Sequence, residues 1–268
     1  MSVIGSNVLA GASGQSAGGG AGGLIPRSLR FNQSDQAYLN RTPSSAGDQK
    51  KWTLSFWFKK ANIGSQRCIF CAWQNNSNRV IVRFLSDKLE FLAQTGGTFY
   101  GVKTQRVFRD PSAWAHAVLV LDTGNSTEAR LRIYINGSEI SSTELDAFSG
   151  SNKYPPLNST FAANGTYAHY LAANYEGSLQ NTTWDGNLAE CLLIDSQALA
   201  PTDFGETNTD NLWVPKAFAG TYGTNGFRLQ FADNSSNAAL GLDTSGLSPA
   251  NTWTVNNLTA ASTTLDGV

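Results

Sequence analysis

The fold class is decided by one stretch of the sequence, Arg130-Leu131-Arg132-Ile133-Tyr134-Ile135-Asn136-Gly137. Apolar and polar residues alternate along it as far as Ile135, and this period of two predicts a half-buried strand. Asn136-Gly137 accepts the positive φ angles of a tight type I′ turn, so residues 138–140 are expected to return as a partner strand. The more continuously apolar segment 114–122 predicts a central neighbouring strand. These segments together predict an antiparallel sheet.

Strand patterns recur along most of the chain, and the strongest is the segment 52–59. Four large apolar residues at alternate positions there share one face, namely Trp52, Leu54, Phe56 and Phe58. Turn-forming residues separate the other expected strands, which are 27–31, 37–39, 67–73, 79–84, 88–92, 167–173, 186–195, 226–231 and 252–256. The last two are expected to pair as a hairpin. Helical periodicity is nearly absent, so the sequence predicts an all-β sandwich or jelly roll.

The composition limits the classes of partner. Of the 268 residues, 41% are hydrophobic and 15% are charged, and the formal net charge is −1. The hydrophobic content is sufficient for a packed core, whereas the charge content lies well below the average of roughly 25%. The surface is therefore expected to be polar but neutral. Neither a basic stripe nor a long apolar run is present, so we expect no nucleic acid and no membrane as a partner.

Three cysteines, an odd number, show no disulfide framework. Cys68 and Cys71 have the CxxC spacing of some redox and zinc sites, but no second pair follows. Their neighbours form a strand pattern, in which positions three apart point to opposite faces. We interpret both as buried free thiols.

The order of several motifs resembles a known superfamily. These motifs are Trp57 within a strand, Trp114-Ala115-His116, the segment 132–137, the segment 184–190 and the segment 199–204. Over about residues 24–205 the chain is similar to the laminin-G-like, concanavalin A-like lectin/glucanase superfamily. The resemblance implies a jelly-roll β-sandwich of two curved antiparallel sheets.

A narrower resemblance rests on the segments 27–32, 38–43, 213–216 and 222–227, and on 243–246 together with 253–257. They resemble concanavalin A-like structural proteins of tailed bacteriophages, of the marine or cyanophage type. The resemblance implies a non-enzymatic virion protein, in a tail fibre, a tail-associated part or a head decoration. It implies a location on the virion after assembly in the host cytoplasm. The implied partners are other virion proteins, copies of the chain in a homo-oligomer, and a host cell-surface glycan.

Three regions are expected on this basis. Residues 1–23 form an extended, glycine-rich N-terminal arm, residues 24–205 the sandwich, and residues 206–268 a C-terminal hairpin extension packed on it. A disordered leader is the alternative interpretation of the arm. If the arm docks on the particle, its candidate anchors are the only apolar side chains before the glycines, namely Val3, Ile4, Val8 and Leu9.

The alternative function is a free carbohydrate-binding lectin module. Glycan contact needs an exposed aromatic ring with nearby polar groups, and two clusters fit this requirement. One is Trp73 with Asn75, and the other is Trp184 with Asp185 and Asn187. Core packing is the competing interpretation of both tryptophans.

Glycoside hydrolysis is the less favoured alternative. Laminarinase-type enzymes of the superfamily need a Glu-x-Asp-x-x-Glu strand with two carboxylates on one face. The nearest match, Glu144-Leu145-Asp146, has Ser149 in the last position. Glu190 and Asp195 are at odd separation in one strand, so opposite faces are expected. We therefore expect no enzyme and no catalytic residue.

No cofactor is expected, although the resemblance implies that calcium is possible. The candidate ligands are Asp185, Asp195, Asp233 and Asp243, for which turn capping is an equal explanation. His116, one of two histidines, is interpreted as a packed or hydrogen-bonded residue.

Overall fold

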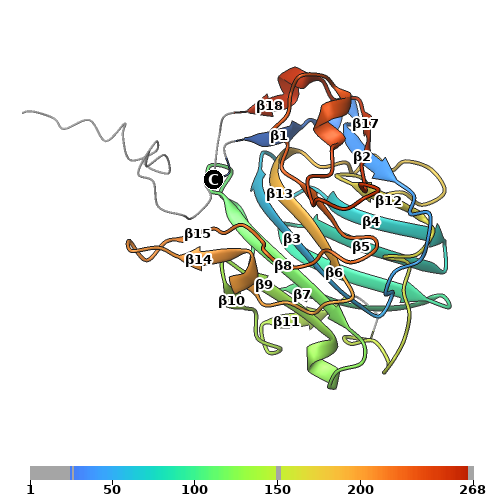
Figure 1. Ribbon diagram of the computed structural model, residues 1–268. Coiled ribbons are helices and arrows are strands. Elements are labelled where there is room, and N and C mark those ends of the chain that lie inside the picture. The colour runs from blue at the N-terminus through green and yellow to red at the C-terminus, as the bar shows by residue number, and fades with distance from the viewer. Residues whose placement is uncertain (1–24, 26, 149–151, 265–268) are drawn as a thin grey trace, which may run out of the picture.

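The computed structural model describes residues 25, 27–148 and 152–264. Two antiparallel eight-stranded sheets pack face to face, and a separate two-stranded ribbon lies beside them (Figure 1). No α-helix occurs in the described ranges, which contain only short 3₁₀ turns. None of these turns has the length or apolarity needed to span a bilayer. The all-β, two-sheet prediction is confirmed.

Sheet A has the order β10–β9–β8–β3–β13–β1–β18, and β16 also pairs with β13. The bounds of its strands are β1 (Ser28–Phe31), β3 (Lys51–Lys60), β8 (Ala115–Asp122), β9 (Leu131–Ile135), β10 (Ser138–Glu139), β13 (Gly186–Asp195), β16 (Phe227–Leu229) and β18 (Thr263–Thr264). The predicted central strand, β8, lies between β3 and β9 as expected.

Sheet B has the order β11–β7–β6–β5–β4–β12–β2–β17. The bounds of its strands are β2 (Tyr38–Arg41), β4 (Arg67–Asn75), β5 (Asn78–Leu85), β6 (Lys88–Thr95), β7 (Thr98–Thr104), β11 (Leu145–Ala147), β12 (Ala168–Leu171) and β17 (Thr254–Asn256). The ribbon consists of β14 (Gly205–Thr207) and β15 (Trp213–Pro215), and the 3₁₀ turns are η2 (Gln33–Asp35), η3 (Thr127–Arg130), η4 (Pro201–Asp203), η5 (Ala238–Gly241) and η6 (Ala260–Ser262).

The core fills the space between the two sheets. The alternate residues of β3 that were expected to share a face all point into it, together with inward side chains of the other strands. Trp52 stacks at a tilt on Phe91 of sheet B, with ring centroids 5.4 Å apart. Such pairs of large rings across the interface bury much apolar surface and fix the spacing of the layers.

The C-terminal region differs from the expected hairpin. β16 joins sheet A by pairing with β13, whereas β17 joins sheet B by pairing with β2. The two segments are therefore in different layers and do not pair with each other. The physical reason is that β13 and β2 both offer an open edge to which a short strand can add. The alternation of apolar and polar residues in a short segment does not specify which of these edges it pairs with. The boundary predicted near residue 205 stays a prediction.

The outer faces of the two sheets differ. On sheet A this face carries a second apolar cluster, made of Val118, Val120, Tyr134, Leu192, Ile194, Phe204 and Tyr222. Phe204 and Tyr222 come from the chain after β13, which crosses this sheet in orange and red in Figure 1. Trp213 of β15 also packs there, against a cluster containing Trp57. Sheet A is thus covered on both sides within the described residues.

The β9–β10 hairpin forms as predicted, with Asn136 at φ +47° and Gly137 at φ +80°. A Cβ atom at Gly137 would lie 2.5 Å from the ring of Trp213, so this turn also receives the β14–β15 ribbon.

We predict that Gly137→Ala destabilises the protein more than Gly64→Ala does. Both glycines have φ +80°, but nothing lies within 4 Å of a Cβ at Gly64. Gly64→Ala should cost about 1–2 kcal/mol for the left-handed conformation. Gly137→Ala should cost about 1–3 kcal/mol more because the methyl group overlaps the Trp213 ring. Urea unfolding measures both, and equal losses would contradict the docking of the ribbon on this turn.

Candidate ligand-binding face

The outer face of sheet B carries the candidate site. Antiparallel register places Trp73 of β4 beside Arg79 of β5, Arg79 beside Gln94 of β6, and Gln94 beside Phe99 of β7. The row therefore begins and ends with an aromatic ring, about 14 Å apart at the normal strand spacing. Polar side chains lie between the two rings.

Four aromatic rings gather around the Trp73 end of this row. Tyr175, in the loop after β12, contacts the Trp73 ring edge to face at a centroid distance of 5.0 Å. It also stacks parallel to Tyr170 at 4.9 Å. Tyr38 of β2 follows at 6.1 Å from Tyr170. Trp73, Tyr38 and Tyr175 are partly exposed, and we call these four rings the aromatic cluster.

The rings are held from below by buried apolar side chains. Cys68, Cys71, Ile81 and Leu92 form the floor on which the aromatic cluster packs. Cys71 Sγ donates to the carbonyl oxygen of Tyr175 at 3.7 Å, which ties the loop to the sheet. Burial, reinforced by neighbouring Tyr175, raises the pKa of Tyr170 to about 12, so its phenol remains protonated at neutral pH.

Cys68 and Cys71 were expected on opposite faces of their strand, and this expectation is wrong. Cys68 and Cys71 lie on the same outer face because a β-bulge between Cys68 and Phe70 shifts the register by one residue. The interpretation as buried free thiols is confirmed, and it holds for Cys191 as well. Burial raises the pKa of each thiol, so none is poised as a thiolate.

The polar side chains of the face form close pairs. Arg79 donates from Nε to Gln94 Oε1 at 2.8 Å, and its Nη1 lies 3.1 Å from Glu176 Oε1. Arg83 donates from Nε to Glu90 Oε2 at 2.7 Å. Such groups can donate to and accept from the hydroxyl groups of a ligand lying across the row.

The structure separates the two clusters predicted to contact glycans. Trp73 lies on the outer face, and Asn75 is exposed at the end of the same strand. Trp184 is 0% exposed in the core between the sheets, so its ring cannot stack on a sugar from solution. Asp185 is ion-paired with Arg30 at 2.8 Å, away from this face.

Asn187 also has a structural role, since its Nδ2 donates to Ser28 Oγ and Thr264 Oγ1 at 3.0 Å each. Sequence reasoning missed Tyr38, Tyr170, Tyr175 and Glu176. Arg79 and Arg83 could have been found, because alternation within the predicted strand 79–84 places them on one face.

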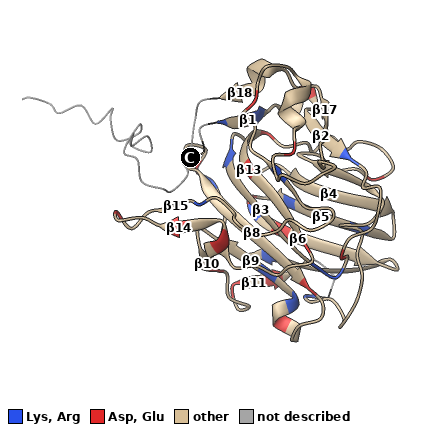
Figure 2. Cartoon of the chain, in the orientation of Figure 1, with Lys and Arg blue, Asp and Glu red and all other residues tan. Residues whose placement is uncertain are grey.

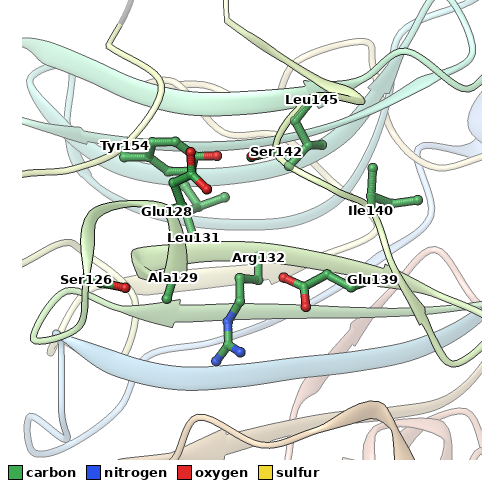
Figure 3. Close-up of a pocket in the computed structure, with 10 residues that line it drawn as sticks. All are labelled: Ser126, Glu128, Ala129, Leu131, Arg132, Glu139, Ile140, Ser142, Leu145 and Tyr154. Carbon is green, nitrogen blue, oxygen red and sulfur yellow. The ribbon is translucent and has the colours of Figure 1, made fainter.

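A separate pocket of about 300 Å³ lies at the edge of the sandwich (Figure 3). Its apolar lining comes from Leu131, Ile140 and Leu145, and its polar lining includes Glu128, Glu139, Arg132 and Tyr154. Burial, together with the negative charges of Glu128 and Glu139, raises the pKa of Tyr154. None of the residues singled out in the sequence as a site residue lines it.

The four candidate calcium ligands do not converge. Within the described ranges, no group of three or more His, Cys, Asp or Glu side chains is placed to hold a metal ion. Asp243 caps a turn by accepting from Ser245 N at 2.9 Å, and exposed Asp233 does the same for Ser235 N at 2.9 Å.

Asp195 is different, because it is 1% exposed and joins several loops. Its Oδ1 accepts from Asp48 N at 2.8 Å, Asn164 Nδ2 at 3.1 Å and Ser196 Oγ at 3.2 Å. Its Oδ2 accepts from Asn225 N at 3.0 Å. Protein donors thus occupy the carboxylate from several directions, as expected of a structural residue.

One pair of side chains has the spacing of a catalytic dyad. Ser55 Oγ lies 2.8 Å from His116 Nε2, but His116 is only 1% exposed and lies between the rings of Trp57 and Trp213. Trp213 Nε1 donates to His116 Nδ1 at 3.0 Å, which leaves the imidazole proton on Nε2. In that tautomer Nε2 donates to the serine and cannot accept its proton. The interpretation of His116 as a packed, hydrogen-bonded residue is confirmed.

Two packed antiparallel sheets, with an apolar cover on the outer face of one and partly exposed rings on that of the other, define a lectin-like β-sandwich. The sequence profile of the concanavalin A-like lectin/glucanases superfamily matches residues 31–203. The chain belongs to this superfamily. No curated protein matches the chain significantly.

Several solved structures are similar to the chain at low sequence identity. A proposed carbohydrate binding protein from Bacteroides ovatus has a TM-score of 0.52 and 15% identity, over 88% of this chain and 60% of that one. A heptameric SAP-like pentraxin from Limulus polyphemus has a TM-score of 0.47 and 16% identity, over 66% and 79%. Domain 4 of an extracellular arabinanase from Geobacillus stearothermophilus, in complex with arabinotriose, has a TM-score of 0.48 and 15% identity, over 69% and 79%.

The buried histidines predict how stability depends on pH. Burial lowers the pKa of His116 to about 3 and that of His169 to about 4. Below pH 6.5 the unfolded chain therefore binds protons that the folded chain does not, and the free energy of unfolding falls. Each histidine should contribute a slope of about 1.4 kcal/mol per pH unit. Urea unfolding between pH 6.5 and 5 should show this slope halved in His116→Gln, and an unchanged slope would contradict it.

A second prediction concerns Asp195. Asp195→Ala should lower the free energy of unfolding by about 3 kcal/mol, because buried donors lose their acceptor. The matched control is Asp233→Ala, an exposed turn aspartate, which should change it by less than about 0.5 kcal/mol. Chemical denaturation measures both, and similar effects would show that Asp195 is not a structural link.

Proposed function

We propose that the protein is a non-catalytic carbohydrate-binding module that holds a glycan on the outer face of sheet B. The observation that carries this proposal is the partly exposed aromatic cluster beside paired hydrogen-bonding side chains. Membership of a superfamily named for lectins and glucanases supports it. So does the apolar covering of the outer face of sheet A, since it leaves less of that face open to a ligand.

Binding follows from the chemistry of sugars. The C–H face of a pyranose is apolar and gains free energy by covering an aromatic ring, while its edge carries hydroxyl groups. The row from Trp73 to Phe99 supplies a ring at each end and donors and acceptors between them. A glycan chain lying along the row meets both requirements. Repetition of such a weak site, on an oligomer or a particle, would raise the avidity.

The absence of catalysis is part of the proposal. The Ser55 and His116 side chains are buried, and the tautomer of His116 does not allow it to accept the serine proton. Glu190 and Asp195 are both buried in β13, where Glu190 is ion-paired with Arg228 and Asp195 joins loops. Calcium is not required by this binding mode. Attachment to a virion stays a prediction from resemblance, since its four anchor candidates, Val3, Ile4, Val8 and Leu9, lie outside the described residues.

We predict that Trp73→Ala weakens glycan binding at least tenfold, equivalent to about 1.4 kcal/mol, because it removes the ring that joins the aromatic cluster to the polar row. The matched control is Trp114→Ala, a partly exposed tryptophan on the sheet A side, which should leave affinity unchanged. A glycan array would identify ligands of the intact chain, and titration calorimetry would compare the variants. A chain that binds no glycan, or a Trp73→Ala variant that binds normally, would refute the proposed site.

A further inference from the structure

We propose that this face selects uncharged glycans, and that Glu176 sets the selection by neutralising Arg79. The inference rests on the proposed function and adds the class of ligand. It comes from the way Arg79 and Arg83, two arginines of this face, are already paired.

Arg79 is held on three sides. Its Nε donates to Gln94, its Nη1 contacts Glu176 at 3.1 Å, and its guanidinium carbon lies 5.2 Å from the centre of the Phe99 ring. The Arg79 side chain is 14% exposed and that of Glu176 is 36% exposed. The carboxylate is therefore the more exposed member of this pair, and Arg79 itself is the register neighbour of Trp73.

Arg83 is paired more deeply. Its partner Glu90 is 3% exposed, and the guanidinium carbon lies 5.6 Å from the centre of the Phe148 ring. In the row of neighbouring residues that contains Arg83 and Glu90, Lys103 lies between Glu90 and Asp146. Lys88 lies 3.9 Å from Asp146. Figure 2 shows blue and red residues interspersed, with most of the ribbon tan.

This arrangement distinguishes two kinds of glycan. A carboxylate or sulfate on a sugar would have to displace Glu176 or Glu90, or be held close to it, and either event is unfavourable in a partly buried site. A hydroxyl group needs no displacement. A hydroxyl group can accept from the remaining guanidinium N–H groups and donate to the carboxylate. The ion pair therefore satisfies the hydroxyl group both as an acceptor and as a donor.

Glu176 is the residue to change, because glutamine keeps an oxygen for the hydrogen bond that Glu176 Oε1 accepts from Asn174 Nδ2 at 3.1 Å. It lies in the loop between β12 and β13, outside any strand, and its side chain is the most exposed member of these two pairs. Glu176→Gln keeps the shape and removes the charge. Arg79 then has an uncompensated positive charge beside Trp73, which a sialylated or sulfated glycan can use.

The test uses the full chain and a glycan array of matched pairs, each an uncharged oligosaccharide beside its sialylated or sulfated form. The wild type should bind the uncharged members at least tenfold more tightly, with affinity independent of salt. Glu176→Gln should gain about tenfold for the charged members, in a salt-sensitive way, while its affinity for uncharged members changes less than twofold. Glu206→Gln, an exposed glutamate on β14, is the control and should match the wild type.

The outcomes separate the two proposals. A wild type that prefers charged glycans, with binding lost in Trp73→Ala, would overturn this inference and leave the proposed function standing. A Glu176→Gln variant with the wild-type preference would overturn the role of Glu176. Binding of neither member of any pair would overturn the proposed function, and this inference with it.

Discussion

Sheet A is apolar on both faces, and the need to bury the second face organises the rest of the molecule. Val118, Val120, Leu192 and Ile194 point away from the core between the sheets, and exposing them would cost about 25 cal/mol per Å² of apolar surface. The chain after β13 covers them with Phe204, Tyr222 and Trp213. On sheet B, the loop that carries Tyr175 covers part of the outer face, and Trp73 stays partly exposed beside it. The asymmetry between the sheets therefore decides where a ligand can reach an ordered β-surface.

Much of this architecture could be predicted from local pattern. The Asn136-Gly137 turn and the alternation on either side of it specify a hairpin without tertiary information, and the structure has that hairpin. Bulges could not be predicted in this way. One additional residue between Cys68 and Phe70 moves Cys68 to the other face, and periodicity does not reveal it. The pairing of β16 and β17 with different sheets was also missed, because the alternation of apolar and polar residues in two short segments does not specify their partner strands.

The candidate site shows the same division. Trp73 and Trp184 both have polar neighbours in the sequence, yet one is partly exposed on the outer face and the other is 0% exposed in the core. Whether an indole is outside or inside depends on what packs against its strand from the opposite layer. Tyr175 and Glu176 belong to a loop, and only its return across sheet B brings them beside Trp73. Loop residues that complete a site are the part that sequence pattern predicts least.

The pairing of charges on sheet B has a consequence for affinity as well as for selectivity. A free arginine on a surface loses considerable side-chain entropy when a ligand immobilises it. Arg79 has already lost that entropy, since Gln94, Glu176 and the Phe99 ring hold it in the absence of any ligand. The interlocked rings of the aromatic cluster are fixed in the same way. An uncharged glycan therefore binds a surface that is already ordered. Little of the free energy gained by ring stacking is then offset by a loss of side-chain entropy in the protein.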